Sequence, residues 1–152
     1  MGLFDVVGSF AAQRIAREHM LHDKRMAAHE ARQAREREDA LRLRDERKEA
    51  YGQLLVHMNK LMDVTRKWHQ ASPEDDNWDE IDAWWDQVRE GFQDQLQLTH
   101  LVCSWEVRDA VERFDVAFWK WMDAKKVDGK RNRDAWAAFE DVKSEMQTDV
   151  RL

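Results

Sequence analysis

YGQLLVHMNKLMDVTRKW, residues 51–68, is the stretch that decides the fold of this chain. Its apolar residues recur every three or four positions, which places them on one face of a helix. That face is wide enough to pack against several neighbouring helices, as the core of a bundle requires. We therefore expect the packed part of the chain to begin at residue 51, with these core residues: Tyr51, Leu54, Leu55, Met58, Leu61, Met62, Thr65 and Trp68.

The preceding stretch, EARQAREREDALRLRDERKEA at residues 30–50, can bury very little. It holds 14 charged residues among 21, and its apolar residues are four alanines and two leucines. Pairs such as Glu38 and Arg42 lie one turn apart and favour a solvated helix. We predict a charged helical arm over residues 13–50. A narrow seam makes the arm resemble a loose coiled coil and allows, without requiring, a homo-oligomer; the seam residues are Met20, Ala27, Ala31, Ala34 and Leu41.

MGLFDVVGSFAA, residues 1–12, forms a short amphipathic apolar tip in front of the arm. Its apolar residues recur at helical spacing, and basic residues follow directly. Gly8 weakens the helix by about 1 kcal/mol relative to alanine, so the tip needs a surface to fold against. We expect it to dock on an anionic membrane surface or in a partner's groove through Leu3, Phe4, Val7, Phe10, Arg14 and Arg17.

Three further amphipathic segments follow residue 68. HQASPEDDN at residues 69–77 ends the first core helix, and either Ser72 or Asn77 starts the next, which runs to about residue 102. Ser104 caps a third helix or lies within a continuous one, and Asp128-Gly129 supplies the turn before the last. The predicted core positions in these segments are Ile81, Trp85, Val88, Phe92, Thr99, Val107, Ala110, Val111, Phe114, Phe118, Trp121, Met122, Ala135, Phe139, Val142, Met146 and Val150.

Together these segments predict an all-α fold. The prediction is an antiparallel four-helix bundle over residues 51–152 that carries a long charged, coiled-coil-like N-terminal helical extension. Five glycines and one proline among 152 residues leave little turn chemistry for hairpins, while eight tryptophans and six phenylalanines argue against disorder.

Three stretches of the predicted bundle carry a resemblance to a known group: RKEAYGQLL at 47–55, LVCSWEVRDAVERF at 101–114 and AWAAFEDVKSEM at 135–146. They resemble small uncharacterised all-helical proteins of actinobacteria and their phages, over roughly the C-terminal two thirds of the chain. The resemblance implies a membrane tether through an N-terminal spanning segment. This chain has only LFDVVGSF, residues 3–10, at the corresponding place.

Charge and cysteine content restrict the partners and the compartment. Residues 13–48 carry eleven basic against eight acidic residues, and residues 49–152 carry fourteen against 22. A mildly basic arm on an acidic body disfavours nucleic acid as a partner. The single Cys103 excludes an internal disulfide, and the sequence shows neither a signal peptide nor a spanning segment. We expect a cytoplasmic protein, either free or peripheral at the inner face of the membrane.

The arm also carries His19, His22, Met26 and His29 on one helical face. Imidazole and thioether ligands on one face can hold a soft or borderline metal, especially where two helices meet. The alternative is that they are ordinary exposed residues, because the chain alone closes no ligand set and contains no Glu-x-x-His pair. We expect no bound cofactor and keep a metal site at His19, His22 and His29 as the alternative.

Residues 74–94 hold nine acids against Arg89, with three tryptophans among them. Aromatic side chains rimmed by acids are typical of a surface that recognises a basic partner, whereas in the simpler alternative the tryptophans lie in the core. A calcium loop beginning at Asp75 is not supported, because Glu80 stands where that loop needs glycine. The predicted partner surface comprises Trp78, Asp79, Asp82, Trp84 and Asp86.

Nucleophilic catalysis has weak support. His100 and Cys103 would be neighbours on a helix, with Ser104 beside them, but the sequence indicates no oxyanion hole, orienting third group or phosphate-binding glycine loop. We therefore predict a non-enzymatic helical interaction or scaffold protein, whose tip docks on a membrane surface or partner groove and whose bundle binds a protein partner. The alternative is a metal- or small-ligand-binding helical protein that uses the His19/His22/Met26/His29 stripe.

Overall fold

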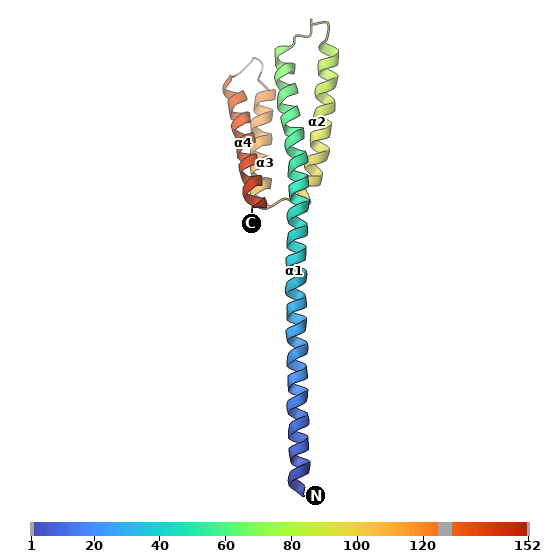
Figure 1. Ribbon diagram of the computed structural model, residues 1–152. Coiled ribbons are helices and arrows are strands. Elements are labelled where there is room, and N and C mark those ends of the chain that lie inside the picture. The colour runs from blue at the N-terminus through green and yellow to red at the C-terminus, as the bar shows by residue number, and fades with distance from the viewer. Residues whose placement is uncertain (1, 125–128, 152) are drawn as a thin grey trace. The chain divides into compact units, whose positions relative to one another are not determined.

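The structure, a computed structural model, describes residues 2–124 and 129–151, without the side chains of residues 3 and 4. These residues form four helices, α1 (Leu3–Gln70), α2 (Trp78–His100), α3 (Trp105–Met122) and α4 (Gly129–Val150), and within them there is no strand (Figure 1). The prediction of an all-helical chain with four helices is confirmed. Within the described residues, no helix is both long and apolar enough to cross a membrane.

The chain divides into two compact units, Met1–Arg42 and Leu43–Leu152. The first unit is the N-terminal part of α1, and every side chain described in it, from Asp5 to Arg42, is exposed. Isolated helices are marginally stable in water, and the exposed ion pairs of Arg14 with Glu18 (3.5 Å) and of Arg42 with Asp39 (3.0 Å) add a few tenths of a kcal/mol each. The apolar side chains of this unit are therefore available to another molecule.

The second unit has a continuous apolar core built from all four helices, and Figure 1 shows these helices packed side by side. Ring contacts join the helices in pairs: Trp68 of α1 lies 5.8 Å from Trp85 of α2, measured between ring centroids, and Phe114 of α3 lies 6.2 Å from Phe139 of α4. Phe114 also lies 6.1 Å from Phe92 of α2. The helix packing is consistent with the predicted bundle.

Most predicted core positions are buried. Five of them are partly buried against the core: Leu55, Trp68, Val88, Met122 and Val150. The predicted residues that are fully part of the core are Tyr51, Leu54, Met58, Leu61, Met62, Trp85, Phe92, Val107, Ala110, Val111, Phe114, Phe118, Trp121, Ala135, Phe139, Val142 and Met146. Thr65 and Thr99 are buried polar residues. Val64, which was not predicted, is also buried, so the core face of α1 is wider than its spacing indicated.

The backbone of α3 and α4 approaches more closely than that of any other helix pair among the described residues. Ala110 of α3 and Ala135 of α4 are both buried, and small side chains allow two helix axes to come close.

Two of the alternatives for helix ends are decided by the structure. Asn77, not Ser72, precedes α2, and residues 72–75 form a turn in which the Ser72 N–H donates to Asp75 Oδ2 at 2.8 Å. Ser104 caps a separate α3, because its Oγ accepts a hydrogen bond from the Val107 N–H at 3.3 Å. The predicted turn at Asp128-Gly129 has its first residue outside the described residues.

Candidate interaction surfaces

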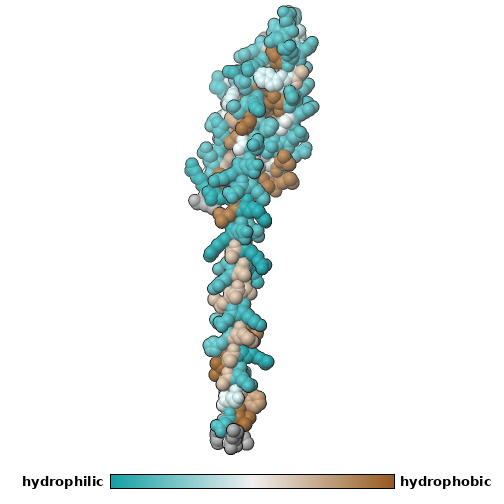
Figure 2. All heavy atoms as spheres, turned by 45° about the vertical axis from the view of Figure 1, so that its right-hand side comes forward, coloured by the Kyte–Doolittle hydropathy of each residue, from teal (hydrophilic) through white to brown (hydrophobic). Residues whose placement is uncertain are grey.

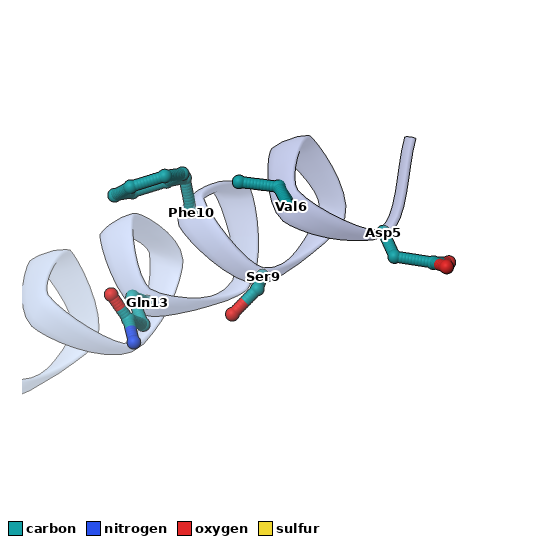
Figure 3. A pocket seen from close by; sticks show the side chains of 5 residues that line it. All are labelled: Asp5, Val6, Ser9, Phe10 and Gln13. Carbon is teal, nitrogen blue, oxygen red and sulfur yellow. The ribbon is translucent and has the colours of Figure 1, made fainter. Parts of the chain in front are cut away.

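The first candidate surface is the N-terminal apolar stripe, formed by Val6, Val7 and Phe10. Phe10 is 68% exposed, and Val6 and Val7 are also exposed. Figure 3 shows Val6 and Phe10 one turn apart on the same side of α1, with Asp5, Ser9 and Gln13 around the shallow hollow that they line. Because all five side chains come from one helix, the hollow is open and can be covered only by another element. The predicted side chains of Leu3 and Phe4 lie outside the described residues.

Arg14 and Arg17 continue the stripe toward the arm. Phe10, Gln13, Arg14 and Arg17 line a second hollow on the same helix, so the two guanidinium groups follow directly after the aromatic ring. Arg14 lies 3.5 Å from Glu18 in an exposed pair, and Arg17 makes no ion pair with any described residue. An apolar stripe that ends in basic residues is typical of helices that lie on anionic surfaces.

The predicted acidic and aromatic surface is split by the packing of the tryptophans. Trp78 is half-buried, and its ring lies 5.8 Å from that of Trp68. The Trp68 Nε1–H donates to Asp82 Oδ1 at 3.1 Å, which ties this carboxylate to α1. Trp78 and Asp82 therefore contribute to the packing between α1 and α2.

Trp84, Asp79 and Asp86 remain on the exposed side of α2. Lys67 Nζ lies 5.0 Å from the centroid of the Trp84 ring, and Asp86 lies 3.7 Å from Arg89. Trp84 also borders a groove between α1 and α2, whose remaining lining is His57, Lys60, Gln87, Val88 and Gly91. Both basic and acidic groups surround the exposed ring, so the surface has no single sign of charge.

A further exposed apolar surface, which was not predicted from the sequence, lies at the turn between α2 and α3. Leu98, Leu101 and Trp105 form this turn patch, and Leu101 and Trp105 are 81% and 70% exposed. The Leu101 N–H donates to the Leu98 carbonyl at 3.2 Å, so the two leucines belong to one turn. Figure 2 shows apolar atoms on the otherwise polar surface of the second unit. The signal was the absence of charged residues from 95 to 105.

Leu98 is shared with a groove between α1 and α2 that we call the acidic groove. Glu46 and Glu49 of α1 supply its charge, and neither makes an ion pair with a described residue. No basic residue is among its lining residues, which are Glu46, Glu49, Ala50, Gln53, Gln95, Leu98 and Val102. The groove therefore combines an apolar wall with two uncompensated negative charges.

A cluster of polar side chains holds the acidic groove and the turn patch in place. Arg47 Nε donates to the Val102 carbonyl at 2.7 Å, and its Nη1 lies 3.5 Å from Asp149 Oδ1. The Tyr51 hydroxyl donates to Asp149 Oδ2 at 2.5 Å and accepts from the Ser104 N–H at 3.2 Å. Burial, reinforced by the hydrogen bond to Asp149, raises the pKa of Tyr51 above its ordinary value. Tyr51 therefore stays a protonated donor.

Arg44 extends this cluster to the end of α4. Its Nε donates to the Val150 carbonyl at 2.9 Å, and basic side chains stabilise the free carbonyls at a helix C-terminus. The packed unit consequently begins at Leu43, whereas the sequence placed the start of the bundle at Tyr51. The reason is that Arg44 and Arg47 are used as long-range donors, although their neighbours on the helix are solvated.

The histidine stripe lies on the exposed part of α1. Among the described residues, no group of three His, Cys, Asp or Glu side chains is placed to hold a metal ion. His19, His22, Met26 and His29 are all exposed, and His29 forms a hydrogen bond at 3.0 Å with Gln33. The geometry gives no support to the metal-binding alternative.

The residues considered for nucleophilic chemistry have structural contacts. Ser104 caps α3, and Cys103 is half-buried against the core. Burial, together with the nearby Arg108 charge, lowers the pKa of His100. The Arg108 guanidinium donates to the His100 carbonyl at 3.0 Å, so these residues shape the turn between α2 and α3.

Comparison with known proteins adds no functional assignment. No protein-family model matches the chain, and neither the curated proteins nor the solved structures contain a significant match.

Proposed function

We propose that this chain is a non-enzymatic helical interaction protein with two binding surfaces. Residues 5–17, which we call the docking helix, bind an apolar surface that carries negative charge, and the second unit binds a protein partner. The observation that carries the proposal is the exposure of Phe10 on the N-terminal part of α1, and of Leu101 and Trp105 in the second unit, where most other large apolar side chains are buried or partly buried.

The chemistry of the docking helix supports an anionic target. Val6, Val7 and Phe10 supply the apolar anchors, and Arg14 and Arg17 supply positive charge on the same side of the helix. Each basic residue near an anionic membrane contributes about 1 kcal/mol of binding, and an acidic protein groove attracts it by the same Coulomb interaction. A membrane surface and an acidic protein groove therefore share the chemistry that this helix recognises.

The architecture proposed with this function has two finer parts. Short connections at residues 71–77 and 101–104 favour an antiparallel order of the four helices in the bundle. The seam from Met20 to Leu41 favours a coiled-coil-like extension, since its side chains are exposed and free to pair. The free Cys103 favours the cytoplasm, including the inner face of the membrane, as the location.

Vesicle co-sedimentation tests the docking helix. The probe is vesicles of phosphatidylcholine and phosphatidylserine at low salt, and the informative variant is Phe10→Asp. Ile15→Asp is the matched control, because Ile15 is 55% exposed on the same helix but does not line the hollows of the stripe.

We expect the unchanged chain and Ile15→Asp to sediment with the vesicles, and Phe10→Asp to stay in solution. Binding falls as sodium chloride is added, because salt screens the attraction of the arginines to the headgroups. Equal sedimentation of Phe10→Asp and the unchanged chain contradicts the anchoring role of Phe10. A chain that does not bind these vesicles at low salt excludes the membrane target.

A further inference from the structure

We propose that the acidic groove of this protein binds the docking helix of a second copy of the same chain. This inference rests on the proposed function and names the protein target of the docking helix. The docking helix matches the acidic groove in charge and in apolar surface, and both surfaces are exposed on the chain.

The charges of the two surfaces are complementary. The acidic groove presents Glu46 and Glu49, three residues apart on α1, and its lining includes no basic residue. The docking helix presents Arg14 and Arg17, also three residues apart on a helix. Both pairs therefore have the same separation along a helix axis, so each guanidinium can face one carboxylate.

The apolar parts are complementary as well. Leu98 and Val102 form the apolar wall of the acidic groove, and Leu101 and Trp105, close to them in the sequence, are exposed as well. Phe10 lies one turn before Arg14, and Val6 lies one turn before Phe10, so a helix that pairs its arginines with the glutamates brings its aromatic ring to an apolar surface. A helix laid into a groove by anchors at such spacing is a common mode of protein recognition.

The contact joins two different surfaces, and this has a consequence for assembly. Each chain carries one docking helix and one acidic groove, so the contact closes as a reciprocal dimer or ring, or extends as a filament. In each case, a copy whose docking helix is disabled can still bind the docking helix of another copy in its acidic groove. A copy whose acidic groove is disabled can still place its docking helix in the groove of another copy. A coiled coil through the arm lacks this property, since both copies then use the same seam.

Analytical ultracentrifugation of the full chain at low salt tests the proposal. The first variant is Phe10→Asp, with Ile15→Asp as its control. The second is Leu98→Asp, with Val116→Asp as its control, because Leu98 and Val116 are 58% and 56% exposed on the same unit. Each informative variant also reports on the other, since their equimolar mixture restores one contact.

We expect the unchanged chain and both controls to associate, with a mass that rises with concentration and falls with salt. Phe10→Asp and Leu98→Asp each weaken association by at least about tenfold, because a buried apolar anchor is replaced by a charge. Their mixture forms a one-to-one complex. The double variant Arg14→Glu/Arg17→Glu loses association, and the addition of Glu46→Arg/Glu49→Arg to the same chain restores it.

Three results overturn the proposal. The first is a chain that stays monomeric at every concentration. The second is a mixture of Phe10→Asp and Leu98→Asp that does not associate. The third is loss of association in Ala34→Glu, a change in the seam, while Phe10→Asp and Leu98→Asp still associate. A monomeric chain that still binds anionic vesicles through Phe10 overturns self-docking alone and leaves the proposed function standing. A Phe10→Asp variant that equals the unchanged chain in both assays overturns both.

Discussion

Replacing Tyr51 by phenylalanine tests how the second unit holds its acidic groove and turn patch. The Tyr51 hydroxyl donates to Asp149 Oδ2 at 2.5 Å and accepts from the Ser104 N–H at 3.2 Å, while the ring is 3% exposed. The substitution keeps the ring and therefore opens no cavity. It removes one hydrogen bond to a carboxylate and leaves a backbone N–H without its acceptor.

The size of the effect follows from these contacts. A hydrogen bond to a charged group contributes about 1.5–3 kcal/mol net, and an unsatisfied buried N–H costs about 1–3 kcal/mol. Asp149 retains Arg47 Nη1 at 3.5 Å and is 15% exposed, so water and the guanidinium recover part of the loss. We expect Tyr51→Phe to lower the free energy of unfolding by about 2–3 kcal/mol.

Urea unfolding monitored by tryptophan fluorescence measures this change, and Asp149→Ala alone and combined with Tyr51→Phe completes a double-mutant cycle. The raised pKa of Tyr51 adds a pH test, because the native state holds its proton more tightly than the unfolded state. The contribution of the Tyr51 hydroxyl to the free energy of unfolding is complete below about pH 10, the ordinary pKa of tyrosine, and is lost as the pH rises above it. A loss below about 0.5 kcal/mol, or no coupling to Asp149, refutes the reasoning.

Three further predictions concern stability. Gly52→Ala raises the free energy of unfolding by about 0.5–1 kcal/mol in urea unfolding, because Gly52 lies within α1 and nothing lies within 4 Å of the added Cβ; a destabilised variant contradicts this. Phe114→Ala lowers the same quantity by about 3–5 kcal/mol, since Phe114 packs on the rings of Phe92, Phe118 and Phe139; a loss under about 1 kcal/mol means that the rings do not form one core. The lowered pKa of His100 makes the native state favour the neutral ring, so its contribution is complete above about pH 6.5 and declines as the pH falls through that value. The midpoint temperature of thermal unfolding therefore declines less steeply from pH 7.5 to 5 in His100→Gln than in the unchanged chain. Parallel plots of midpoint against pH for the two chains contradict this role of His100.

The parts of the fold that the sequence predicted are those governed by helical periodicity. Residues such as Leu54, Met58 and Phe114 recur at spacings that only a helix places on one face, and all of them are buried. Ser104 was an ambiguous position, because a capping serine and a serine inside a helix look alike in sequence. The hydrogen bond from the Val107 N–H to Ser104 Oγ decides it.

The surfaces were harder to predict, because they depend on tertiary contacts. Asp82 resembled its acidic neighbours, yet the indole of Trp68 engages it. Arg44 and Arg47 sit in a run of charged residues, and only the distant carbonyls of Val150 and Val102 distinguish them. Trp105 was a further tryptophan in a chain rich in them, and its exposure depends on where α3 begins.

We propose that the second unit supplies the stability of the fold, while residues 3–42 supply a binding helix. Urea unfolding of a chain shortened to residues 43–152, compared with the full chain, tests it most directly. We predict a cooperative transition with the same slope, since the slope follows the surface exposed on unfolding, and a free energy of unfolding within about 1 kcal/mol of the full chain. A shortened chain that unfolds without cooperativity, or loses several kcal/mol, contradicts the claim.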